Sequence, residues 1–104
     1  MIRKSTQSRK TAETDINLSI DLTQRDGSSI HTTLPFFDHM LTAMSFHGGF
    51  QLSIEATGDT NVDPHHLVED TGLVLGDAFS EILAEGGLIR YAHAMVPMDD
   101  ALAE

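Results

Sequence analysis

The segment that decides the fold is TDINLSIDLT, residues 14–23. Its apolar residues alternate strictly with polar ones, which is the period of a β-strand with one buried face. A glycine-containing turn follows at residues 25–28, and Ile30, Thr32 and Leu34 then resume the alternation. We therefore expect the segments on either side of this turn to pair as a β-hairpin.

Two more strands and two helices are expected around this hairpin. Residues 50–56 alternate equally cleanly, and residues 2–10 alternate weakly, as an edge strand would. One helix is expected over roughly residues 36–46, and a longer one should begin near Asp63 or Pro64 and end at Gly86. The resulting order, βββαβα, predicts an α+β fold. It should be a two-layer sandwich in which a four-stranded mixed sheet carries both helices on one face.

Apolar side chains on the two helices predict the position of the core. The longer helix has one apolar stripe at helical spacing, formed by Leu67 or Val68, Thr71, Val74 or Leu75, Ala78 or Phe79, and Ile82 or Leu83. A second set of large apolar residues is expected in the core rather than in a binding site: Phe37, Met40, Met44 and Phe79. Gly72 and Gly76 lie one turn apart and lower helix propensity, so we expect another backbone to approach them closely.

Length and charge limit the classes of function. The 104 residues are enough for a single domain or part of one. Sixteen acidic residues against six basic ones give a formal charge of −10, and no lysine or arginine lies between Asp26 and Ile89. That stretch repels nucleic-acid phosphate and attracts cations. Nucleic-acid binding is therefore disfavoured.

The absence of cysteine excludes a disulfide scaffold, a thiolate zinc site and a cysteine nucleophile. It also suits a reducing compartment. No apolar run approaches the roughly 20 residues that a membrane span needs, and no secretory signal follows the N-terminal charges. We expect a cytoplasmic protein with neither membrane nor nucleic-acid partners.

The densest polar cluster is DPHHLVED, residues 63–70, at the start of the longer helix. Glu69 lies four residues after His65 and three after His66, so the three side chains project from neighbouring points of the helix. Adjacent histidines point about 100° apart, which favours two metal ions, or one ion with a ligand from elsewhere. Such a ligand is His39 on the other helix, where Asp38 could orient its ring.

Imidazole and carboxylate ligands without thiolate suit Mn, Fe, Co, Ni or Zn. The alternative is that the histidines are exposed residues at a helix start, where Glu69 only complements the helix dipole. His47, at the end of the shorter helix, could either satisfy the last carbonyls or contact a substrate, and His31 is expected on the surface. No role can be assigned to His93. Metalloprotease, nucleotide-binding and serine-hydrolase motifs are all absent.

Taken together, the motifs over residues 9–102 are highly specific. They are Thr11-Ala12-Glu13-Thr14, Phe36-Phe37-Asp38-His39-Met40-Leu41, Phe46-His47-Gly48, Gly58-Asp59, His65-His66-x-x-Glu69-Asp70, Leu75-Gly76, Arg90-Tyr91 and Pro97-Met98-Asp99-Asp100. In these motifs the chain resembles imidazoleglycerol-phosphate dehydratase.

The resemblance implies a hydro-lyase of histidine biosynthesis that removes water from imidazole glycerol phosphate, a small phosphorylated imidazole, to give imidazole acetol phosphate. It implies two Mn²⁺ ions per complete active site, two duplicated βββαβα halves per subunit, a homo-oligomer of 24 subunits, and active sites between subunits. The implied metal ligands are His39, His65, His66 and Glu69. The implied catalytic residues are Glu13, His39, His66 and Glu69, and the implied substrate contacts are Glu13, His39, His47, His65, His66 and Arg90, the last holding phosphate.

Members of this family are nearly twice as long and carry a second His-His-x-x-Glu set. We therefore expect residues 1–87 to form the first half-domain, residues 88–104 to begin a truncated second one, and the chain to be inactive alone unless copies pair. Two other hypotheses remain. One is a non-catalytic, metal-binding half-module that self-associates through its apolar helix faces, and the other is a structural domain with incidental histidines.

Overall fold

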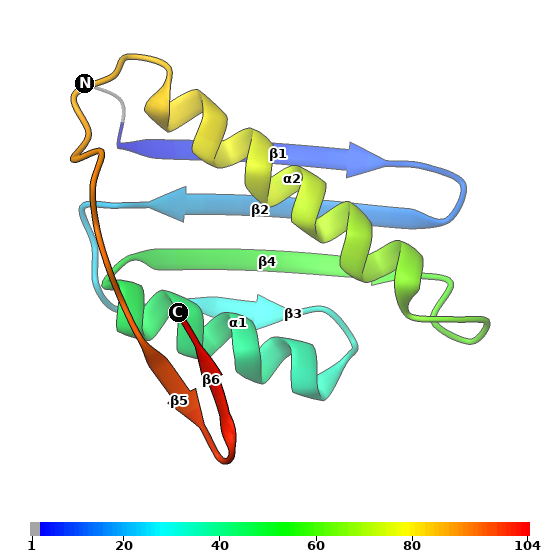
Figure 1. Cartoon of the computed structure of the whole chain (residues 1–104). Helices are drawn as coiled ribbons and strands as arrows, with labels where there is room; N and C mark the ends of the chain where they lie inside the picture. Colours follow the sequence, from blue (N-terminus) through cyan, green and yellow to red (C-terminus); the bar gives the residue numbers. More distant parts are fainter. Residues whose placement is uncertain (1–2) are drawn as a thin grey trace.

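A computed structural model describes residues 3–104 of the chain. It contains, in order, β1 (Lys4–Lys10), β2 (Thr14–Asp21), β3 (Ser29–His31), α1 (Pro35–Gly48), β4 (Gln51–Gly58), α2 (His65–Leu83), β5 (Val96–Met98) and β6 (Ala101–Ala103). The first four strands form one sheet in the order β1-β2-β4-β3, with only β3 and β4 parallel, and both helices cover the same face (Figure 1). The predicted α+β sandwich with a mixed sheet is confirmed, as is the edge strand β1.

The predicted hairpin between β2 and β3 is wrong. β4 lies between them and pairs antiparallel with β2 over eight residue pairs, from Thr14–Gly58 to Asp21–Gln51. β3 adds only three parallel pairs on the other side of β4. The loop after β2 runs past the start of β4, where the Leu52 amide donates to Ser28 Oγ at 3.0 Å. The longer ladder satisfies more backbone groups than a three-residue hairpin could, so β4 takes the central position.

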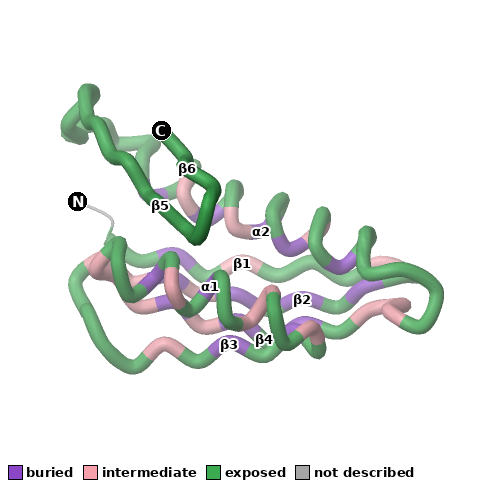
Figure 2. The backbone as a smooth tube through the Cα atoms, turned by 60° about the horizontal axis from the view of Figure 1, so that its bottom comes forward, coloured by how far each residue is buried: buried purple, intermediate pink, exposed green. Residues whose placement is uncertain are grey.

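The core lies between the sheet and the helices, mostly under α2 (Figure 2). Alternate strand residues supply one side of it: Ile16, Leu18, Ile20, Leu52, Ile54 and Ala56. The predicted stripe of α2 supplies the other side through five buried residues, Leu67, Thr71, Val74, Ala78 and Ile82. Two further residues of that stripe, Val68 and Leu83, are instead 40% and 44% exposed. Each fully buried Leu or Ile side chain contributes roughly 1.5–3 kcal/mol. Burial of α2 therefore fixes the helix that begins at the His-His pair.

Replacing Leu67 by alanine should lower the free energy of unfolding by about 2–5 kcal/mol, because Leu67 is fully buried at the start of α2. Chemical denaturation followed by circular dichroism measures this change. Leu73→Ala is the matched control, since Leu73 lies on the same helix but is 50% exposed, and it should cost about 0.5 kcal/mol or less. Equal losses in the two variants would contradict the assigned orientation of α2.

The expectation that the methionines of α1 lie in the core is wrong. Phe37 and Phe79 pack against the core, but Met40 and Met44 are 36% and 40% exposed. The residues that α1 buries against the sheet are Leu41 and Ser45. Since neighbouring helix positions differ by about 100°, this orientation turns both methionines away from the sheet.

Gly72 and Gly76 on α2 have open space around them. A Cβ atom built at either glycine meets nothing within 4 Å among residues 3–104. The predicted close approach of another backbone is therefore not made within the described chain. The outer face of α2 is free at these positions.

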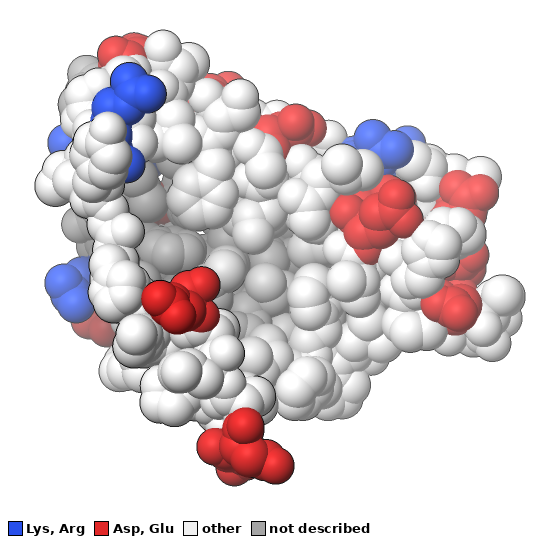
Figure 3. All heavy atoms as spheres, in the orientation of Figure 1, with Lys and Arg blue, Asp and Glu red and all other residues white. Residues whose placement is uncertain are grey.

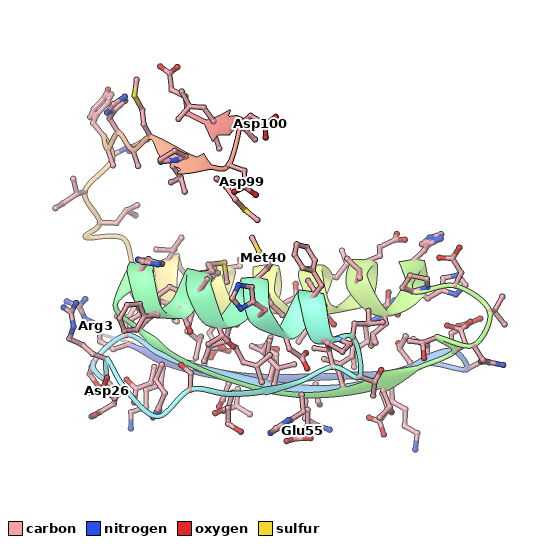
Figure 4. The ribbon with its side chains drawn as sticks, turned by 90° about the horizontal axis from the view of Figure 1, so that it is seen from below. Arg3, Asp26, Met40, Glu55, Asp99 and Asp100 are labelled. Carbon is pink, nitrogen blue, oxygen red and sulfur yellow. The ribbon has the colours of Figure 1, made fainter. Side chains whose placement is uncertain are left out.

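The chain after α2 forms a separate tail, defined here as residues 88–104. α2 ends at Leu83, three residues before the expected stop, and Gly86 and Gly87 follow with positive φ. Residues 88–95 are irregular, and β5 and β6 then pair as an exposed antiparallel hairpin. The tail lies on the side of the helices that faces away from the sheet (Figure 4). Within residues 3–104, neither helix combines the length and apolar character needed to cross a bilayer.

Candidate metal and substrate site

The chemistry-bearing residues gather at one end of the sheet. The turn between β1 and β2 carries Glu13, the loop between β4 and α2 carries Asp59, and both helices begin at this end (Figure 1). The two loops are tied together, because the Asp59 amide donates to the Glu13 carbonyl at 3.1 Å. A cavity of about 370 Å³ is lined by residues 10–15 and 57–59. Acidic side chains are prominent at this end of the molecule (Figure 3).

His65 and Glu69 form a preorganised pair one helical turn apart. His65 Nε2 lies 2.8 Å from Glu69 Oε2, and both side chains are exposed. The Asp63 carboxylate accepts a hydrogen bond from the His65 amide at 2.7 Å, so it satisfies one of the first donors of α2, although Pro64 occupies the N-cap position. Neighbouring ligands of an octahedral ion with bonds near 2.1 Å lie about 3 Å apart, which this pair matches.

His66 is oriented by Asp59. Nδ1 of His66 lies 3.1 Å from Asp59 Oδ2, and this hydrogen bond raises the pKa of His66 above 6.5. Partial desolvation opposes the increase, while the negative charges of Asp59, Glu13 and Asp70 add to it. The contact holds the ring through Nδ1, so a metal ion would bind Nε2. This orienting role was not predicted from the sequence, although Asp59 directly follows β4 and lies six residues before the His-His pair.

Asp70 anchors the start of α2 to the sheet. Its carboxylate accepts a hydrogen bond from Thr14 Oγ1 at 2.6 Å and lies 3.7 Å from Arg9 Nε. Thr14 is buried and the Asp70 side chain is 15% exposed, so the contact is largely withdrawn from water. The contact between Asp70 and Thr14 sets the orientation of the first turns of α2, in which the preceding residue, Glu69, is exposed to solvent. This positioning role was also missed, because it depends on a contact between distant parts of the sequence.

Asp38 does not serve the predicted purpose of orienting His39. Its carboxylate accepts hydrogen bonds from both the amide, at 2.9 Å, and the hydroxyl of Thr32. Thr32 is fully buried and needs an acceptor for these donors, which explains why it engages the carboxylate. Asp38 therefore fixes the start of α1, and His39 stands exposed on the next residue.

The predicted metal ligands do not converge within one chain. In the part of the chain that the structure describes, no three or more His, Asp or Glu side chains are placed to hold a single ion. What residues 3–104 offer is two adjacent imidazoles, with ring centroids 4.7 Å apart, each paired with a carboxylate. Such donors fit a divalent ion whose remaining ligands come from another chain or segment.

Two predicted substrate contacts lie elsewhere. His47 is at the C-terminal end of α1, and Arg90 is exposed in the tail beyond α2. α2 has 19 residues and so spans about 28 Å, and the tail, which carries Arg90, begins beyond the C-terminal end of that helix (Figure 1). Their substrate roles stay predictions. His31 is on the surface as expected, 3.3 Å from Ser29 Oγ and 4.0 Å from Glu55.

Asp59→Asn should lower the pKa of His66 toward 6.5 in the metal-free chain, because it removes the negative charge of the hydrogen-bond acceptor. A group whose pKa is raised by folding stabilises the fold below its unfolded pKa, and this contribution is lost as pH rises through the folded value. An NMR titration of the ring protons measures the shift. Asp15→Asn is the control, and a His66 pKa that falls equally in both variants would contradict the assigned contact.

The chain is similar to known proteins in both sequence and fold. A family model described as imidazoleglycerol-phosphate dehydratase matches residues 32–104, well over half of the chain. The relative of that name from Methanoculleus marisnigri is 52% identical over 103 residues, covering 98% of this chain and 53% of its own. The Lacticaseibacillus casei relative is 48% identical over 103 residues, covering 98% and 53%.

Two solved dehydratase structures are also similar. The Staphylococcus aureus enzyme has a TM-score of 0.78 at 35% identity, covering 95% of this chain and 53% of its own. The Pyrococcus furiosus enzyme has a TM-score of 0.70 at 40% identity, covering 91% and 49%. The chain thus spans about half the length of the relatives it matches. With its fold and its motifs, these matches show that the chain belongs to the imidazoleglycerol-phosphate dehydratase family.

Proposed function

We propose that this chain supplies one half of the active site of an Mn²⁺-dependent imidazoleglycerol-phosphate dehydratase of histidine biosynthesis. The reaction removes water from imidazole glycerol phosphate and gives imidazole acetol phosphate. The observation that carries the proposal is the start of α2. There His65 is paired with Glu69 at 2.8 Å and His66 with Asp59 at 3.1 Å, beside the loop of Glu13.

His39, His65, His66 and Glu69 are the proposed ligands of this chain, and His39 serves a site that includes a second chain or segment. When bound, the two Mn²⁺ ions supply positive charge that stabilises an imidazole ring in its deprotonated form. The chain's own contribution is orientation. Asp59 holds the His66 ring and Asp70 holds the first turns of α2, so the ligands need little reorganisation.

A carboxylate must take the proton from the carbon that loses it, while hydroxide leaves from the neighbouring carbon and is released as water. Glu13 and Glu69 are the two candidates. Glu13 accepts a hydrogen bond from Thr11 Oγ1 at 3.2 Å and lines the same cavity as Asp59, the partner of His66. Substrate contacts are proposed for Glu13, His39, His47, His65, His66 and Arg90, with the Arg90 guanidinium holding phosphate.

The proposed active site needs a second half for two reasons: the metal-ligand set of this chain is incomplete, and its net charge is strongly negative. Residues 3–104 hold no complete ligand set, and Arg90 alone cannot balance a phosphate dianion in a chain with a formal charge of −10. The relatives contain about as much chain again, which we propose to supply the remaining ligands and basic residues. We accordingly propose that the chain alone is inactive, and that the complete enzyme is a cytoplasmic homo-oligomer.

The direct test is to produce the chain together with the remaining half of the Methanoculleus marisnigri relative. Formation of imidazole acetol phosphate should require both halves and Mn²⁺, with the chain alone as the control. A soluble two-part complex that binds Mn²⁺ but shows no turnover would contradict the proposed activity.

A second function is favoured by a different observation. The outer helix faces expose large apolar side chains, including Phe46 at 69%, and Gly72 and Gly76 leave room for close approach. Such a surface suits a metal-binding half-module that self-associates without catalysis. Sizing of the chain with and without Mn²⁺, followed by an assay with substrate, separates this function from the first.

A further inference from the structure

The start of α1 is fixed by a contact to β3 rather than by a capping side chain. Leu34 occupies the N-cap position and makes no side-chain capping hydrogen bond, and Pro35, the first helical residue, has no N–H to donate. The Asp38 carboxylate reaches back instead. Its Oδ1 atom accepts hydrogen bonds from both the amide and the hydroxyl of Thr32. This contact links the residue that follows β3 to the first turn of α1.

The backbone between Thr32 and Asp38 contains a strained residue. Thr33 has a φ of 69°, in the left-handed region, which is unfavourable for a β-branched side chain. Such a conformation persists only where the surrounding structure imposes it, and strained residues cluster at functional sites. On one side of Thr33 the buried Thr32 is bound to Asp38, and on the other side the ring of Pro35 fixes its own φ. The approach of the chain to α1 is therefore restricted on both sides.

Asp38 is also held through its backbone. Thr42, one helical turn further along α1, donates from Oγ1 to the Asp38 carbonyl at 2.7 Å. The residue that follows Asp38 is His39, whose side chain is exposed. The contacts of Asp38 thus set the direction in which His39 leaves the helix, and they act through the backbone rather than through the imidazole ring.

We infer that Thr32 and Asp38 are positioning residues for metal binding by His39. The inference rests on the proposed function, in which His39 is a ligand of a site that includes a second chain or segment. Helix ends fray, and a ligand in a frayed turn has no single position. A site whose ligands come from two partners needs each ligand held in place before the partners meet. The strain at Thr33 is the cost of joining the buried end of β3 to a helix that presents His39 outward.

Thr32→Val tests the contact without a change of charge, because it replaces the hydroxyl of a buried side chain by a methyl group of similar size. In the metal-free chain, ¹⁵N relaxation measures the order of the His39 backbone amide. This order should fall in Thr32→Val and in Asp38→Ala. Thr32→Ser keeps the donor and Asp38→Asn keeps an accepting oxygen at Oδ1, so both conservative variants should retain the order of the unchanged chain.

The effect on metal binding is measured in the complex of the chain with the remaining half of the relative. Thr32→Val should raise the Mn²⁺ concentration for half-maximal binding by about tenfold, the lower end of the effect of residues that orient ligands. Electron paramagnetic resonance of the free ion follows the titration. Thr32→Ser should restore the affinity.

Two variants separate positioning from stability. Ser45→Ala removes another buried hydroxyl of α1, which donates to the Thr42 carbonyl at 3.0 Å near the far end of the helix. It should lower the thermal midpoint without a change in Mn²⁺ affinity. Thr33→Gly relieves the strained backbone and keeps Thr32 and Asp38, so it should raise the midpoint and also leave the affinity unchanged.

The inference would be overturned if Thr32→Val kept the order of the His39 amide, or if it weakened Mn²⁺ binding no more than Ser45→Ala does. If Thr32→Val does not fold, the comparison of Asp38→Ala with Asp38→Asn decides in the same way, because Asp38 is only partly buried. Failure of the proposed function gives a different result. Mn²⁺ binding without turnover in the unchanged complex would overturn the proposed activity alone, whereas absence of Mn²⁺ binding there would overturn both.

Discussion

His65→Ala should lower kcat/KM of the two-part enzyme by about 10³-fold. His65 forms the tightest histidine–carboxylate pair of the proposed site, so its loss removes a ligand and leaves Glu69 without its partner. Metal ions stabilise developing charge by several kcal/mol, and each 1.36 kcal/mol corresponds to about tenfold in rate. The measurement is turnover at saturating Mn²⁺, together with the metal content of the purified complex.

His31→Ala is the matched control, because His31 is also exposed but lies on β3, away from the start of α2. It should change kcat/KM by less than about twofold. The assignment of His65 as a ligand would be contradicted if the His65→Ala variant kept a tenth or more of the activity and its full metal content.

Glu13→Gln should lower kcat by about 10²–10⁴-fold if Glu13 moves the proton, which is the usual contribution of a general acid or base. Glutamine keeps the size of the side chain and can still bond to Thr11, so metal content and assembly should not change. Glu69→Gln provides the comparison. Because Glu69 is a proposed metal ligand, Glu69→Gln should lower the metal content of the complex together with its activity.

The two carboxylates are thereby separated by two readouts, turnover and bound metal. Glu55→Gln, an exposed change on β4, is the control and should have no effect on either. Glu13→Gln with unchanged kcat would exclude Glu13 as the proton carrier and leave that role to Glu69.

Local periodicity predicted the helices and strands of the main sheet and the buried faces of β2 and α2, but it misplaced Met40 and Met44 of α1. The alternation at Ile16, Leu18 and Ile20 indicated the inward face of β2 without information from the rest of the chain. It could not indicate which strand lies beside β2. Both β3 and β4 have the required alternation, and the choice depends on ladder length and on the path of the connecting loop.

The site was predictable to a similar extent. The spacing of His65 and Glu69 alone predicted that they would meet, because both lie on one helix. The orienting contact from Asp59 and the anchoring contact from Asp70 to Thr14 join different elements, so neither contact has a signal in the local sequence. Asp38 was assigned to a neighbour in sequence, whereas the buried donors of Thr32 determine its contact.

The central position of β4 also affects the kinetics of folding. β1 and β2 can pair as soon as the turn between them forms, because it joins adjacent residues. The β2–β4 ladder instead pairs Thr14 with Gly58, so a loop containing β3 and α1 must close first. Closing this loop costs conformational entropy before the hydrogen bonds of the ladder can form. High contact order of this kind slows folding. We expect closure of this loop to limit the rate, with α1 and the β1–β2 hairpin forming first.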